Sequence, residues 1–133
     1  ACLNPASQLS IIEIIGAIVW LIGISGEALA DAQMNAFKRD PATKGQVCQV
    51  GLWRYSRHPN YFFESVVWLG FWLFACGSPS GWATVYAPAL ILYFLLRVTG
   101  IPLTEECAVK SKGDAYREYQ RTTSAFVPWF RKA

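Results

Sequence analysis

The residues of this chain that are best suited to chemistry lie together in residues 51–64, GLWRYSRHPNYFFE. The segment holds the only histidine, His58, with Arg57 immediately before it and Asn60 two positions later. Arg54 and Arg57 provide planar, bidentate donors that suit phosphate groups, and Asn60 provides two donors and an acceptor. These residue types predict a site for a phosphate-bearing cofactor or an anionic headgroup.

Glu64 lies one helical turn beyond Asn60, where the sequence becomes apolar. Residues 62–76 are apolar apart from Glu64 and Ser65, and ionisable groups within a membrane segment tend to face a bundle interior or a cavity. A protonated carboxyl in an apolar pocket can donate a hydrogen bond to a substrate carbonyl and stabilise a developing oxyanion. A structural role for Glu64 also remains open.

Plainer interpretations of the neighbouring residues remain open as well. Arg54 and Arg57 could be membrane-anchoring cations, and His58 could cap a turn. Three aromatic residues of the segment fit either an interfacial belt or stacking on a ligand ring: Trp53, Tyr55 and Tyr61.

The chain lacks the common motifs for nucleotides and metals. Neither Gly-x-Gly-x-x-Gly nor the Walker pattern occurs, so a nucleotide would be bound without a Rossmann or P-loop turn. Four cysteines lie far apart without a CxxC pair, and we expect unpaired thiols: Cys2, Cys48, Cys76 and Cys107. With one histidine and scattered cysteines, no metal site is predicted.

Composition predicts that membrane helices position the segment. The chain has 133 residues, 53% hydrophobic and only 16% charged, against about 25% charged in soluble domains. We expect one membrane domain over residues 1–133. The sequence begins Ala-Cys-Leu-Asn without a Met and shows no signal peptide. It is therefore expected to be a fragment of a longer membrane protein, whose N-terminal helices would be partners.

The predicted fold class is all-α: a polytopic membrane bundle of about three transmembrane helices with a C-terminal amphipathic interfacial helix. Residues 10–30, 60–76 and 82–98 are the apolar segments. The first helix is expected to continue to Lys38 and to end before Pro41, and Pro88 to kink the third. Thr104 is expected to cap the amphipathic helix, residues 105–122.

Charge predicts the topology. All twelve Lys and Arg lie in residues 38–57 and 97–132, so the positive-inside rule places loop 38–61 and the C-terminal tail in the cytoplasm. The expected location is multi-pass in a bacterial inner membrane or an endoplasmic reticulum membrane, without nucleic-acid partners. Phe126, Trp129 and Phe130 predict an interfacial anchor that contacts membrane lipids. Glu27, Asp31 and Lys38 share a helix face that is either solvated or the wall of a ligand cavity.

The segment with its Arg-His-Pro-Asn-Tyr core resembles the signature of the membrane steroid 5-alpha-reductase superfamily. It looks closest to an uncharacterised bacterial-type branch that carries the 5-alpha-reductase C-terminal domain. The core is also similar to that of sterol C14 reductases, and a shorter form occurs in isoprenylcysteine carboxyl methyltransferases. The resemblance extends over essentially the whole chain.

The resemblance implies an integral membrane oxidoreductase that uses NADPH to reduce a carbon–carbon double bond in a lipid-like or steroid-like substrate. Glu64 would be the catalytic acid that polarises the substrate carbonyl, and Asn60 would contact the nicotinamide end. Further cofactor contacts implied are Asp31, Lys38, Arg54, Arg57, His58, Tyr61, Arg97, Tyr116 and Tyr119.

Two features depart from the reductase pattern: the residue before Glu64, and the absence of the N-terminal half that in the reductases forms much of the substrate cavity. Without that half, the fragment alone is expected to bind cofactor poorly or not to catalyse. Phe63 stands where the family often has glycine, which is expected to narrow the pocket or change helix packing. The pair Glu105-Glu106 ahead of Tyr116 resembles the tail of the methyltransferases, so an S-adenosylmethionine-dependent membrane methyltransferase is an alternative. A non-catalytic, lipid-binding membrane module is the other.

Overall fold

The computed structural model describes residues 9–132. Helix α1 (Ile11–Arg39) begins after Ser10, because the Ser10 side chain accepts from the Glu13 N–H while Glu13 accepts from the Ser10 N–H at 2.7 Å. This capping box satisfies backbone donors that a helix start leaves unpaired. The helix ends at Arg39, as predicted, because Asp40 precedes Pro41 and adopts an extended conformation.

Helix α2 (Pro59–Ala75) packs along α1, and small residues let the two backbones approach closely. Gly16, Gly23 and Ala30 are buried at seven-residue spacing on α1, which keeps them on one face. A Cβ atom at Gly23 would lie 2.6 Å from the backbone nitrogen of Val67 on α2. Such close contacts between helices are typical of membrane bundles.

Phe63 of α2 completes this contact. A Cβ atom at Gly26 of α1 would lie 2.2 Å from the Phe63 ring. The Phe63 side chain, larger than the glycine often found at this position, is therefore accommodated by Gly26 on the facing helix. Its effect is on the packing of α1 against α2.

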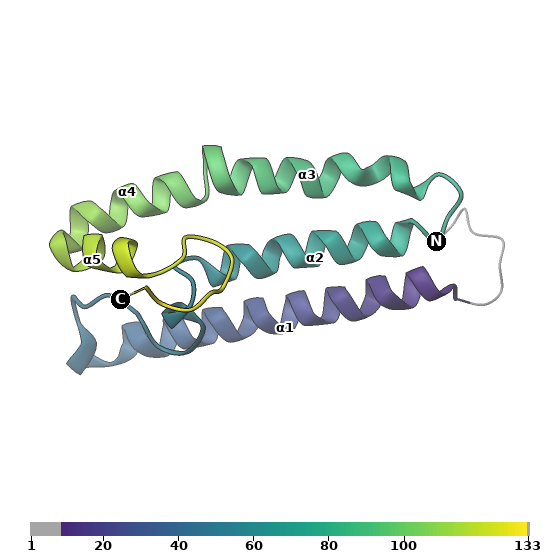
Figure 1. The fold of residues 1–133 in the computed structure, drawn as a ribbon. Coiled ribbons are helices and arrows are strands. Elements are labelled where there is room, and N and C mark those ends of the chain that lie inside the picture. The colour runs from purple at the N-terminus through teal and green to yellow at the C-terminus, as the bar shows by residue number, and fades with distance from the viewer. Residues whose placement is uncertain (1–8, 133) are drawn as a thin grey trace.

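The chain then reverses at residues 76–80. Figure 1 shows α2 between α1 and the helical run that follows, while the C-terminal tail returns to the end where α2 begins. The remaining elements are η1 (Pro41–Thr43), η2 (Gly51–Arg54), η3 (Gly81–Val85), α3 (Tyr86–Tyr93), the π-helical turn η4 (Phe94–Val98), α4 (Ile101–Lys112) and α5 (Asp114–Thr122). Within residues 9–132 the fold is all-α, and the only extended pairing described is a bridge between Ser56 and Ser124.

Two predictions about the C-terminal half were wrong in detail. The single helix expected over residues 105–122 is two helices, because Gly113 has φ +57° and interrupts the run. Helix α4 also begins at Ile101 rather than after Thr104, because Pro102 fits a first turn, where its missing N–H has no helical partner to lose. The Thr104 hydroxyl instead donates to the Gly100 carbonyl at 2.9 Å.

The third apolar segment is not a uniform helix. A 3₁₀ turn, α3 and the π-helical turn η4 follow one another along it. Pro88 lies in the first turn of α3, where an N–H is not needed for the helix. The expected irregularity is therefore spread over both ends of α3 and is not confined to Pro88.

Two helical runs are long and apolar enough to cross a membrane, Ile11–Arg39 and Gly81–Lys112. Their apolar side chains mostly face outward: Ile18, Leu21 and Leu90 are each more than half exposed. Exposed apolar faces of this length favour a membrane protein. With 17 residues α2 is shorter, so a third span, the interfacial helix and the topology stay predictions.

Candidate functional site

A cavity of about 660 Å³ lies at the end of the bundle where α1 ends and α2 begins. The last turns of α1, loop 43–48, the turn before α2, and parts of α4 and α5 form its walls. The volume falls within the range of about 300–1,000 Å³ that is common for small-molecule sites. Most of the predicted site residues line it: Asp31, Lys38, Arg57, His58, Asn60, Tyr61, Tyr116 and Tyr119.

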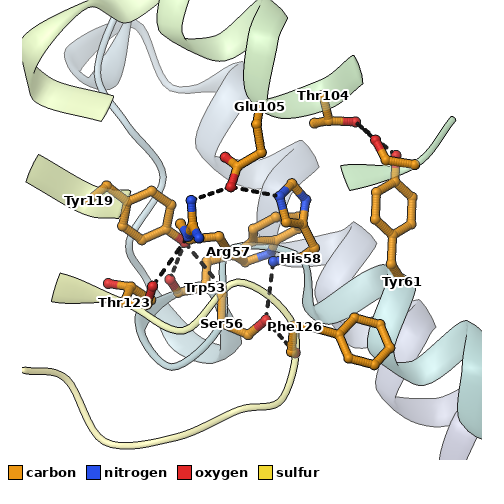
Figure 2. Close-up of polar contacts among 11 residues, drawn as sticks. Trp53, Ser56, Arg57, His58, Tyr61, Thr104, Glu105, Tyr119, Thr123 and Phe126 are labelled. Atoms are coloured by element: carbon orange, nitrogen blue, oxygen red, sulfur yellow. Dashed lines mark hydrogen bonds and ion pairs between the residues drawn. The ribbon is translucent and has the colours of Figure 1, made fainter. Parts of the chain in front are cut away.

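The C-terminal tail holds the turn that presents Arg57 and His58. The Arg57 N–H donates to the Ser124 carbonyl at 2.8 Å. The buried Ser56 hydroxyl donates to the Phe126 carbonyl at 2.8 Å and accepts from the His58 N–H at 3.1 Å (Figure 2). Pro59 then occupies the first turn of α2, where its fixed φ suits a helix start.

Tyr119 and Trp53 support the same turn. The Tyr119 side chain is 2% exposed, and its phenol donates to the carbonyl of Trp53, with the Ser56 carbonyl 3.1 Å away. Burial raises the pKa of the Tyr119 phenol, which keeps it protonated as a donor. The Trp53 indole donates to the Ala30 carbonyl of α1 at 2.9 Å. Because backbone groups occupy the Tyr119 hydroxyl, this residue shapes the cavity and is not free to bind a ligand through that hydroxyl.

An ion pair connects the turn to α4. The Arg57 guanidinium pairs with the Glu105 carboxylate, and the same oxygen, Oε1, lies 3.6 Å from His58 Nε2. Figure 2 shows Glu105 reaching between Arg57 and His58. The side chains of Arg57 and Glu105 are 12% and 14% exposed. Burial, followed by the neighbouring Glu105 carboxylate, raises the pKa of the Tyr116 phenol on α5.

Beside this pair the cavity wall offers a flat ring and an unused acceptor. The His58 and Tyr61 rings stack with centroids 5.4 Å apart and planes at 13°. The Asn60 Oδ1 atom is buried and has no hydrogen-bond partner among residues 9–132. A buried acceptor without a donor costs about 1–3 kcal/mol, so a ligand donor at Asn60 would relieve a penalty already present.

Three predicted site residues do not line the cavity. Arg54 and Arg97 are exposed and lie outside the cavity lining. Glu64 is half-buried on α2, one turn from Asn60, and interacts electrostatically with Glu27 and Asp31 of α1. Glu64 therefore extends the polar wall from the cavity toward the apolar part of the bundle.

Sequence reasoning missed several residues that the structure brings to the site. Lys44 and Lys112 line the cavity with Lys38, although their charge had been interpreted only as a topology signal. The sequence indicates only that Glu105 resembles part of the methyltransferase tail, whereas the structure shows that its carboxylate contacts Arg57 across 48 positions of the chain. No local sequence pattern predicts a contact between residues so far apart in the chain.

The cysteines within residues 9–132 are free thiols, as predicted: Cys48, Cys76 and Cys107. Burial raises the pKa of the Cys48 thiol, which suits an unreactive packing residue. Cys2 lies outside the described residues. In the part of the chain that the structure describes, no cluster of three His, Cys, Asp or Glu could hold a metal ion.

The arrangement can hold an elongated, partly anionic ligand. Lysines from α1, loop 43–48 and α4 offer positive charge to phosphate or carboxylate groups. The stacked rings and the Asn60 acceptor suit a planar group that carries an N–H or O–H donor.

Comparison with known proteins places the chain in a family. Residues 1–123 match the model of a family described as proteins of unknown function, DUF1295, and the chain belongs to that family. It is also 37% identical over 81 residues to the uncharacterised protein C594.04c of Schizosaccharomyces pombe. That alignment covers 59% of this chain and 22% of the yeast protein, so the chain spans about a fifth of that relative's length. No solved structure matches the chain.

Proposed function

We propose that this member of the uncharacterised family is the cofactor-binding part of an integral membrane oxidoreductase. It would use NADPH to reduce a carbon–carbon double bond in a lipid-like or steroid-like substrate, as its resemblance to the steroid 5-alpha-reductase superfamily implies. The observation that carries the proposal is that one cavity combines the unpaired Asn60 acceptor with a cationic lining.

The residues present fit such a cofactor. Lys38, Lys44 and Lys112 come from three different elements, so a phosphate chain could run between them. Asn60 Oδ1 would accept from the carboxamide N–H, and the His58–Tyr61 stack offers an aromatic surface beside it. In this arrangement the phosphates would lie toward the lysines and the nicotinamide ring toward α2.

Glu64 is the proposed acid. When bound, NADPH would supply the hydride for one alkene carbon, and the second hydrogen would come from solvent as a proton. Glu64 would hold a proton on its carboxyl group and donate a hydrogen bond to the substrate carbonyl, stabilising the charge that develops there. It stands one turn from Asn60 on the same helix, so a substrate approaching from the apolar side would meet both groups.

A second candidate is a methyltransferase that uses S-adenosylmethionine on a lipid-like substrate. The position of Glu64 favours it, because this carboxylate lies outside the cavity lining and methyl transfer would not need it. The same cavity walls would then hold an adenosine group, with the donor's N–H groups meeting Asn60.

The test is a binding titration on the full-length protein purified in detergent. NADPH and S-adenosylmethionine are titrated separately against the wild type, Asn60→Ala and a control, Gln120→Ala, which removes an amide outside this cavity. We expect saturable NADPH binding that Asn60→Ala weakens about 10-fold or more, as loss of a ligand hydrogen bond predicts. Binding of the methyl donor alone would replace the proposal with the second candidate.

A kinetic arm tests Glu64 separately. With an enone of a steroid or lipid as substrate, Glu64→Gln should lower kcat by about 100-fold or more while leaving NADPH affinity within about twofold. Glu118→Gln, on the exposed face of α5, is the matched control. Unchanged turnover in Glu64→Gln would remove this residue from the mechanism.

A further inference from the structure

Helix α4 forms one wall of the cavity yet is weakly attached to the bundle. None of its residues is buried, although Thr104, Ala108 and Lys112 line the cavity. A helix that buries little apolar surface gains little from packing and is held by the few specific contacts it makes.

Both ends of α4 are suited to movement. Gly100 precedes it and follows the π-helical turn η4, and Gly113 ends it with φ +57°. A Cβ atom at Gly100 would lie 2.7 Å from the Leu95 carbonyl oxygen, so this junction requires glycine. Hinges are commonly a few residues at element ends, and π-helical turns often mark functional positions.

Two polar contacts tie the start of α4 to the turn before α2 and to the first turn of α2 itself. The first is the ion pair of Glu105 with Arg57, which also brings the carboxylate to His58 (Figure 2). The second joins the Tyr61 and Thr104 hydroxyls at 3.0 Å. The Glu105 pair is the stronger of the two, because both of its partners are ionised and largely withdrawn from water.

We propose that Glu105 is the positioning residue of this cavity. It holds the Arg57 guanidinium in the wall, with its carboxylate 3.6 Å from His58 Nε2, and through the Arg57 contact it holds α4 over the ligand. As a statement about cofactor affinity the inference rests on the proposed function, whereas the attachment of α4 does not depend on it.

Geometry separates Glu105 from its neighbour. Glu106 is exposed and pairs with Lys110 at 3.0 Å along the same helix, so its charge contributes to α4 alone. Glu105 contacts the turn before α2 and lies beside Tyr116 of α5. The two adjacent carboxylates thus form a matched pair for a test, with the same chemistry on the same helix and different partners.

The first experiment is hydrogen–deuterium exchange on the full-length protein in detergent, without ligand. In Glu105→Gln we expect amides of residues 101–112 to exchange about 10- to 100-fold faster, the range that a hydrogen bond to a charged group supplies. Exchange in α1 and α2 should stay as in the wild type, and Glu106→Gln should leave all three helices unchanged. Equal α4 exchange in Glu105→Gln and Glu106→Gln would overturn the proposal.

If Glu105→Gln increases amide exchange in all helices, a milder variant is measured in its place. Glu105→Asp keeps the charge and withdraws it by one methylene group. In that variant α4 should still show the largest increase in exchange, and a uniform increase over all helices would overturn the positioning role.

The second experiment measures NADPH binding and dissociation in the same proteins. Glu105→Gln should dissociate NADPH about 10-fold faster or more, Glu105→Asp should recover part of the difference, and Glu106→Gln should match the wild type. Wild-type levels of binding in Glu105→Gln would overturn the effect on affinity. A wild type that binds no NADPH, with α4 exchange still dependent on Glu105, would refute the proposed function and leave the attachment of α4 standing.

Discussion

Replacing Tyr119 by phenylalanine tests whether the tail holds the cavity wall as the structure indicates. The substitution keeps the ring and removes only the phenol oxygen. Two backbone carbonyls, those of Trp53 and Ser56, then lose the donor that Tyr119 provides. Both belong to the segment that leads into Arg57 and His58, so the loss falls directly behind the cavity.

The expected cost follows from burial. The Tyr119 side chain is 2% exposed, so water cannot readily replace the lost donor. A buried acceptor left unpaired costs about 1–3 kcal/mol, and we expect the free energy of unfolding to fall by that amount. Tyr55→Phe is the control, because Tyr55 is 42% exposed. Its change should stay within about 0.5 kcal/mol, as for other surface substitutions.

The assay is reversible unfolding of the full-length protein in detergent, followed by tryptophan fluorescence, since Trp53 itself reports on this region. A second readout is cofactor affinity, which should weaken in Tyr119→Phe as the turn loosens. If Tyr119→Phe and Tyr55→Phe are equally stable, the hydrogen bonds from the Tyr119 phenol do not stabilise the turn and the reasoning fails.

Three further predictions concern packing, pH and charge. Gly23→Leu should destabilise the bundle by about 1–3 kcal/mol or prevent folding, because α2 leaves no room for a side chain at this position. Ala17→Leu, on the exposed side of α1, is the control and should be tolerated. If Gly23→Leu is as stable as Ala17→Leu, the close packing of α1 against α2 is contradicted. Burial raises the pKa of Tyr116 and Tyr119 above the ordinary value of about 10. Above that pH the unfolded chain releases these protons while the folded chain keeps them, so stability should be full below about pH 10 and fall as pH rises beyond it. Melting temperatures between pH 8 and 11 check this, and a shallower fall is expected in Tyr119→Phe. Lys44→Ala should weaken NADPH binding by up to about fivefold, the effect of one exposed charge, and should reduce its salt dependence, whereas an unchanged salt dependence would exclude Lys44 from phosphate binding.

The sequence by itself determined the first two helices and most of the residues that line the candidate site. The Ser10 cap and Pro41 determine where α1 begins and ends, and Pro59 determines where α2 begins, because these signals act within a few residues of chain. The Arg-His-Pro-Asn-Tyr core identified the polar cluster for the same reason: its members are neighbours in sequence, and most of them line one cavity.

Only the tertiary structure decided how that cluster is supported. Residues 53–57 are contacted by the Glu105 carboxylate, the Tyr119 phenol and a tail carbonyl across 48 to 70 positions of chain. Hydrogen bonds over such separations produce no periodic pattern in the sequence. The break at Gly113 was not predicted either, because one glycine in a polar helix can be tolerated and the sequence does not show that its φ is positive. Local signals therefore defined which residues could do chemistry, and long-range contacts defined which of them face the cavity, leaving Glu64 beyond its lining.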